Sequence, residues 1–85
     1  MINRHEIARH FKQNYYNEKE TQHDMCKRYL DMNGEITPLE ALEAFGCFRL
    51  SAIIFDLRRD GWNIRTDINE GKKKYAVYVL EKGDE

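Results

Sequence analysis

Hydrophobic residues recur at two spacings along this chain, and the change of spacing divides it into two parts. Up to residue 60 the apolar side chains return every three or four positions, which is the period of an α-helix. Residues 62–68 then alternate apolar with polar, and residues 75–80 are rich in β-branched and aromatic side chains. The pattern therefore predicts a group of helices followed by a β-hairpin with its turn at residues 69–72.

The helix expected at residues 37–45 has clear start and stop signals. Thr37 and Glu40 form a T-x-x-E capping box, and Pro38 occupies the first helical position, where its missing N–H is not needed. Gly46 suits the left-handed conformation that ends many helices. Between these signals, apolar residues recur at helical spacing at Leu39, Leu42 and Phe45.

A second helix is expected at residues 49–60, with Gly61 as its stop. Its inward stripe consists of Leu50, Ile54 and Leu57. Two short helices joined across a glycine turn predict a helix-turn-helix, whose second helix can enter the major groove of DNA.

Two further helices are expected before this unit. Residues 3–16 begin with a capping pair, Asn3 and Glu6, and carry an apolar stripe of Ile7, Phe11 and Tyr15. The stripe either packs on the protein's own core or forms a surface for a dimer or another partner. Residues 21–32 begin with a T-x-x-D cap, and their buried face is expected to hold Met25, Cys26, Tyr29 and Leu30.

The order helix, helix, turn, helix and hairpin is that of a winged helix, in which the hairpin is the wing. Residues 35–36 are a short extended segment that can pair with the hairpin. We therefore expect an α+β fold with a two- or three-stranded wing and an extra N-terminal helix. The expected division is an N-terminal helix and connection (residues 1–20), a winged-helix domain (21–82) and a frayed tail (83–85).

Residues 21–80 also carry short motifs that go beyond this order of elements. The most specific are GEITPLEAL at residues 34–42, RLSA at 49–52 and LRRDGW at 57–62. Further matching residues are Thr21, Gln22, Tyr29, Leu30, Phe45, Gly46, Ile54, Ile64, Tyr78, Val79 and Leu80. With these motifs the chain resembles a family of small phage and prophage winged-helix (helix-turn-helix) proteins. The resemblance implies a winged helix, an origin in a phage or mobile element, and DNA binding as the default role.

The sequence departs from that family on the second helix of the unit. Ile53 stands where a basic or polar residue is common, and Phe55 stands where a polar or His residue is usual. Because the inward stripe is already filled, we expect both to widen the apolar surface of this helix, beside the acidic Asp56 and Asp60. Such a surface suits contact with another protein as well as with DNA.

The same helix holds the candidate DNA contacts on its outward face. Arg49 at the helix start can reach a guanine edge, Ser51 a phosphate or base, and Ala52 a thymine methyl group. Arg59 lies on the same face, where Asp56, three residues before it, can pair with it. The alternative is a face exposed to solvent or to a protein.

The turn of the hairpin holds the strongest cluster of positive charge, at Lys72, Lys73 and Lys74. On a wing such lysines neutralise DNA phosphates; otherwise they keep an exposed hairpin soluble and unpaired. Arg58 and Arg59 have long side chains that can lie over the hairpin and support it.

Composition narrows the choice of function. The 85 residues suffice for one domain with a small core, and the formal net charge of −1 does not favour a protein held on DNA by bulk charge alone. The charge is unevenly distributed, because residues 35–48 hold no Lys or Arg whereas residues 49–82 are locally basic.

Several classes of function have little support. The sequence has no Gly-rich phosphate loop, paired-carboxylate site or nucleophile elbow, so we expect neither an enzyme nor a cofactor. Cys26 and Cys47 are too far apart for a CxxC metal site and are expected to be buried free thiols, without a bound metal. No apolar run could cross a membrane and the start lacks a signal peptide, so we expect a cytoplasmic protein without a membrane partner.

Two hypotheses from different classes follow. The first is a small DNA-binding protein that acts in transcription regulation. The second helix of its helix-turn-helix, residues 49–60, would lie in the major groove of double-stranded DNA, and the lysines of the wing would contact the backbone. The N-terminal helix would form a homodimer. The second is a protein-binding module that engages or inhibits a host or phage protein, with a candidate interface of Ile7, Phe11, Tyr15, Ile53 and Phe55.

Overall fold

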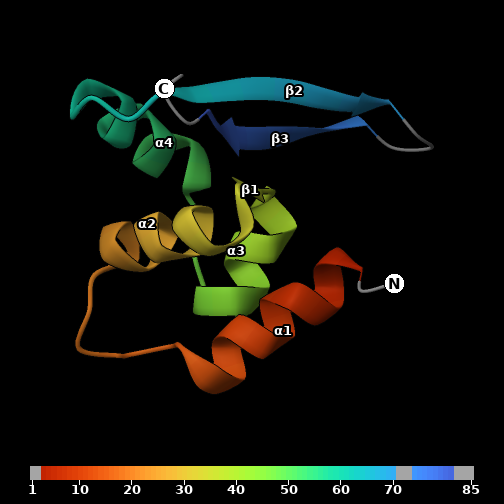
Figure 1. Cartoon of the computed structure of the whole chain (residues 1–85). Helices are drawn as coiled ribbons and strands as arrows, with labels where there is room; N and C mark the ends of the chain where they lie inside the picture. The colour runs from red at the N-terminus through yellow and green to blue at the C-terminus, as the bar shows by residue number, and fades with distance from the viewer. Residues whose placement is uncertain (1–2, 71–73, 82–85) are drawn as a thin grey trace.

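The structure, a computed structural model, describes residues 3–70 and 74–81 of the chain (Figure 1). Its helices and first strand are α1 (Arg4–Asn14), α2 (Gln22–Asn33), β1 (Glu35–Ile36), α3 (Pro38–Phe45) and α4 (Leu50–Arg59). Strands β2 (Ile64–Glu70) and β3 (Lys74–Leu80) follow. In Figure 1 the sheet lies at one end of the molecule and α1 at the other. This is the expected α+β winged helix with an extra N-terminal helix.

A two- or three-stranded wing was expected, and the structure has three strands. Both β1 and β2 pair with β3, which gives an antiparallel sheet in the order β1-β3-β2. Ile36 of β1 lies opposite Tyr78, and β2 pairs with β3 from Ile64, opposite Leu80, towards the turn. Because Ile36 is fully buried, the two-residue strand β1 attaches the sheet to the core.

The helix ends follow the expected chemistry. Thr37 Oγ1 accepts the backbone N–H of Glu40 at 3.2 Å, while Glu40 Oε1 accepts the backbone N–H of Thr37 at 2.9 Å. Asn3 makes the same reciprocal pair at the start of α1. Gly34 and Gly46 have φ of +83° and +68° at the ends of α2 and α3, where a residue with a Cβ would be strained. These glycines fix the turns on either side of β1 and α3.

The stripe on α1 packs on the protein's own core. The rings of Phe11 and Tyr29 lie 5.1 Å apart between centroids, and those of Phe11 and Phe45 lie 6.0 Å apart. Phe11 is 1% exposed and Ile7 is partly buried, whereas Tyr15 keeps 37% of its surface. Of the two alternatives for this stripe, packing on the core holds for Phe11, whose ring lies between α2 and α3; Phe11 is therefore not available to the candidate interface.

Helix α3 turns a different face inward from the one that its leucines indicate. Its buried residues are Glu40, Ala41, Ala44 and Phe45. Leu39 is 75% exposed and Leu42 is 40% exposed, so only Phe45 of the three evenly spaced apolar residues lies in the core. Two alanines on the inward face allow α3 to approach its neighbours closely.

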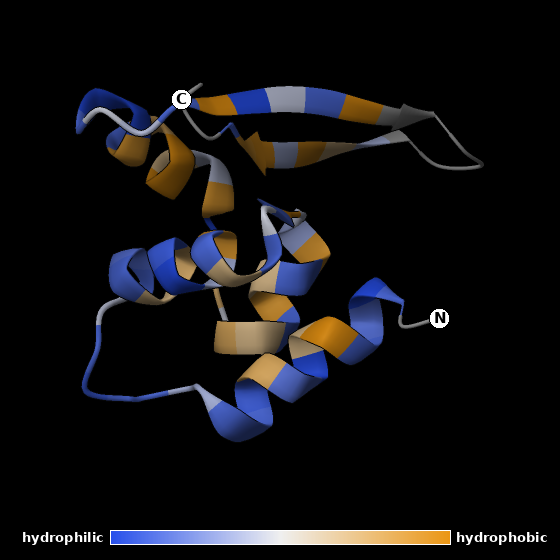
Figure 2. Cartoon of the chain, in the orientation of Figure 1, coloured by the Kyte–Doolittle hydropathy of each residue, from blue (hydrophilic) through white to orange (hydrophobic). Residues whose placement is uncertain are grey.

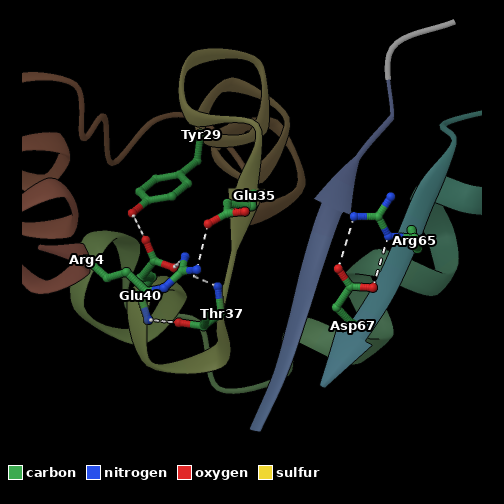
Figure 3. Close-up of polar contacts among 7 residues, drawn as sticks. All are labelled: Arg4, Tyr29, Glu35, Thr37, Glu40, Arg65 and Asp67. Atoms are coloured by element: carbon green, nitrogen blue, oxygen red, sulfur yellow. Dashed lines mark hydrogen bonds and ion pairs between the residues drawn. The ribbon is translucent and has the colours of Figure 1, made fainter. Parts of the chain in front are cut away.

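A buried carboxylate joins α1, α2 and α3 (Figure 3). Glu40 is 4% exposed; its Oε2 accepts the Tyr29 hydroxyl at 2.6 Å, and its Oε1 accepts Arg4 Nη1 at 3.2 Å. Burial and the hydrogen bond to Glu40 raise the pKa of Tyr29 far above its ordinary value, so its hydroxyl remains a donor. A buried carboxylate without such partners would be unfavourable.

Candidate nucleic-acid interface

Helix α4 packs inward through four residues, Leu50, Ile53, Ile54 and Leu57. Figure 2 shows that hydrophobic residues concentrate on α3 and α4, whereas α1 and α2 are mostly hydrophilic. Ile53 is only 4% exposed, so the prediction that it widens the outer apolar surface and forms a protein interface is wrong. The physical reason is its position three residues after Leu50, which puts it on the inward side of the helix.

The outward face of α4 holds the residues predicted to contact DNA from this helix. Arg49, Ser51, Ala52 and Arg59 are all exposed. Phe55 lies among them and is 61% exposed, as the sequence predicted, and Phe48 in the preceding turn is 85% exposed. No side chain caps the first turn of α4, and within it the backbone N–H groups of Ala52 and Ile53 donate to the carbonyl of Arg49.

The acidic residue on α4 is held by two neighbours. Asp56 Oδ2 lies 2.9 Å from His23 Nε2, and Asp56 Oδ1 accepts a hydrogen bond from Arg59 Nη2 at 3.4 Å. The pairing with Arg59 was expected from their spacing. The contact with His23 has no signal in the sequence, because 33 residues separate the two. It attaches α4 to α2.

Arg58 attaches α4 to the wing. Its Nε donates to the carbonyl of Ile64 at 2.9 Å, and its Nη2 donates to Thr66 Oγ1 at 2.6 Å. The predicted support of the hairpin by Arg58 is thus confirmed. Arg59 behaves differently, since its guanidinium carbon lies 5.5 Å from the centre of the Phe55 ring.

Arg65 of β2 is paired with carboxylates. Arg65 donates to Asp67 through Nε and Nη2, both at 3.0 Å (Figure 3), and also bonds Glu81. The hydrogen bonds from Arg65 lower the pKa of Asp67, so this pair stays ionised at neutral pH. Lys72 and Lys73 lie outside the described residues, and Lys74 is described as the first backbone position of β3.

A groove of about 530 Å³ opens between the start of α1, helix α3 and strand β3. Its apolar lining comes from Pro38, Leu39 and Leu42 of α3 and from Tyr75 of β3. Sequence reasoning missed this surface, because the spacing of the two leucines with Phe45 indicated one continuous apolar face.

The cysteines are buried free thiols, as expected. Burial raises the pKa of Cys26 to about 12. Across residues 3–70 and 74–81, no three His, Cys, Asp or Glu side chains gather in a way that could hold a metal ion. None of the helices in those ranges has the length and hydropathy needed to span a bilayer.

Comparison with known proteins gives a family match for the region from α2 to the end of the sheet. The family described as winged helix-turn-helix domain matches residues 21–83, about three quarters of the chain. No curated protein and no solved structure matches the chain significantly. The family match starts at the cap of α2 and leaves out α1, and it points to DNA binding in general terms.

Proposed function

Because this chain belongs to the winged helix-turn-helix domain family, we propose that it binds double-stranded DNA through α4 and the wing. In this proposal α4 lies in the major groove, and Lys72, Lys73 and Lys74 contact the phosphate backbone. The observation that carries it is the outward face of α4, where Arg49, Ser51 and Ala52 are exposed near the N-terminus of the helix.

Each of these groups has a role that suits DNA. A guanidinium at the start of a recognition helix reaches O6 and N7 of guanine, which is the role of Arg49. The exposed hydroxyl of Ser51, in the first turn of α4, suits phosphate oxygens. Arg58 stays on β2 and holds helix and wing together while Arg59 faces outward. The activity is binding without catalysis.

Origin and assembly are further parts of the proposal. The resemblance to small phage and prophage proteins supports an origin in a phage or mobile element, a role in transcription regulation and a cytoplasmic location. A homodimer through α1 stays a prediction. With Phe11 buried, its apolar contacts would rest on Tyr15, which is 37% exposed, and on the partly buried Ile7.

The test is binding of a fluorescent random-sequence 20-base-pair duplex to the full chain, followed by anisotropy at several salt concentrations. We expect binding at low salt that weakens steeply as salt rises, because released counterions drive the phosphate contacts. The triple replacement of Lys72, Lys73 and Lys74 by Ala should make the slope of log affinity against log salt shallower, by the amount expected for about three phosphate contacts.

The matched control removes the same charge from the other end of the molecule. Arg9 and Lys12 lie on α1 and Lys19 follows it, far from the sheet in Figure 1. Their triple replacement with Ala should leave the affinity within about twofold, because exposed charges beyond a Debye length are screened. Absence of any binding at low salt overturns the proposal.

A second candidate function is a protein-binding module that engages or inhibits a host or phage protein. The groove beside Leu39 favours it, since Leu39 and Leu42 of α3 are 75% and 40% exposed there, away from the residues proposed to contact DNA. In that case the lysine triple variant keeps its partner, whereas Leu39→Asp loses it. Salt-dependent DNA binding that survives Leu39→Asp favours the first function.

A further inference from the structure

Phe55 is a large apolar side chain that the core does not use. The inward stripe of α4 is complete without it, and its ring remains 61% exposed one turn after the exposed Ser51 and Ala52. Phe48 adds a second exposed ring just before the helix begins. We call Ala52 and Phe55 the apolar face of α4. An apolar surface of this kind on a helix that faces outward indicates a contact with a partner.

The charges around the apolar face favour an anionic partner. Arg49 stands between Phe48 and the helix, and the guanidinium of Arg59 lies over the ring of Phe55. Two acidic residues lie close by in the sequence. Asp56 is paired with His23 and Arg59, and Asp60 follows directly after the helix. Arg49, Arg58 and Arg59 against Asp56 and Asp60 leave one positive charge on residues 49–60, so a partner of this face meets apolar groups with a small positive excess. Duplex DNA offers that combination, since its phosphates flank the grooves and apolar groups lie within them.

Only one apolar group is displayed by base edges in the major groove, which is the 5-methyl group of thymine. Phenylalanine and alanine side chains are among those that contact it. We propose that the apolar face of α4 reads these methyl groups, so that the preferred sites are duplexes with thymine beneath Ala52 and Phe55. This inference rests on the proposed function and adds the class of sequence that is bound.

The test compares duplexes that differ only in a methyl group. The unmodified protein is titrated into alternating adenine–thymine duplex and into the same duplex with uracil in place of thymine. A second pair is alternating guanine–cytosine duplex with cytosine or with 5-methylcytosine. We expect about three- to fourfold tighter binding to the methylated member of each pair, the gain that follows from removing one such group from water.

Variants assign the effect to the apolar face. Phe55→Ala should reduce the preference for the methylated member of each pair, because Ala52 still contacts a methyl group, while the salt dependence stays unchanged. Tyr16→Ala removes an aromatic ring of comparable exposure far from α4 and should keep the preference. The circular dichroism of both variants should match that of the parent chain, because both rings are exposed.

The outcomes separate this inference from the proposed function. Salt-dependent binding with equal affinity for thymine and uracil duplexes overturns the reading of methyl groups and leaves DNA binding intact. A methyl preference of undiminished size in Phe55→Ala overturns the assignment to this face. No binding to any of the four duplexes at low salt overturns both.

Discussion

The hydroxyl of Tyr29 donates a 2.6 Å hydrogen bond to Oε2 of Glu40, and this contact joins α2 to α3 inside the core. The other oxygen of the same carboxylate accepts the backbone N–H of Thr37 and a guanidinium N–H of Arg4. Glu40 is thus both the local cap of α3 and the group on which three helices meet. The stability of the scaffold that presents α4 depends on this side chain.

Tyr29→Phe should destabilise the fold by about 1.5–3 kcal/mol, the contribution of a hydrogen bond to a charged group. The ring and its packing against Phe11 are kept, so the change isolates the hydroxyl. Urea unfolding followed by circular dichroism measures the free energy. Tyr16→Phe, at an exposed position, is the matched control and should change nothing. Equal stability of the two variants would contradict the role given to the hydroxyl.

Glu40→Ala should be more severe, by about 3–5 kcal/mol, because it leaves buried donors without their acceptor. The comparison is Glu43→Ala on the same helix. Glu43 lies 2.6 Å from His5 in a partly exposed pair, and exposed pairs of this kind contribute at most about 1 kcal/mol. Thermal unfolding of the two variants gives the ranking, and a loss at Glu43 as large as that at Glu40 would refute it.

The capping box at Thr37 and Glu40 could be read from the sequence, because cap chemistry depends on residues three positions apart. The burial of Glu40 could not, since its other partners lie 11 and 36 residues away. The same limit applies to His23 and Asp56. Helix ends and the order of elements are local properties and were predicted closely.

Which face of a helix turns inward depends on tertiary packing, and the sequence predicted it correctly for some residues and wrongly for others. Leu50, Ile54 and Leu57 were placed correctly, whereas Ile53 at the border of the stripe was not. On α3, Ala41 and Ala44 face the core together with Glu40 and Phe45. Leu39 and Leu42 lie on the opposite, exposed side of the helix. The position of Phe55 outside the core was predicted, since the stripe beside it was already filled.

Cys26 makes stability sensitive to alkaline pH. Burial raises its pKa from 9.0 to about 12, so the folded chain holds the neutral thiol while the unfolded chain ionises. This contribution to the free energy of unfolding is complete below pH 9 and is lost as pH rises towards 12. We expect a smaller alkaline decline in Cys26→Ala. At pH 8, iodoacetamide followed by peptide mapping should label Cys26 only after urea is added.

Arg58→Ala should loosen the wing. It removes two hydrogen bonds from the guanidinium to β2, so we expect a loss of about 1.5–3 kcal/mol and faster amide exchange along β2. Hydrogen exchange followed by NMR resolves the strand from the helices. Arg59→Ala, at the next position, removes the same charge without touching β2 and should leave exchange there unchanged; equal acceleration in both variants would contradict the assignment.

The hydrogen bonds from Arg58 to Ile64 and Thr66 also fix the separation between α4 and the wing. Helix and wing cannot vary their separation independently while this guanidinium holds the first positions of β2 to the last turn of α4. A duplex that contacts both elements at once therefore has to adjust its groove width to the fixed separation of α4 and the wing. Base steps differ in how readily they deform, so base pairs that the protein never touches would influence its choice of site.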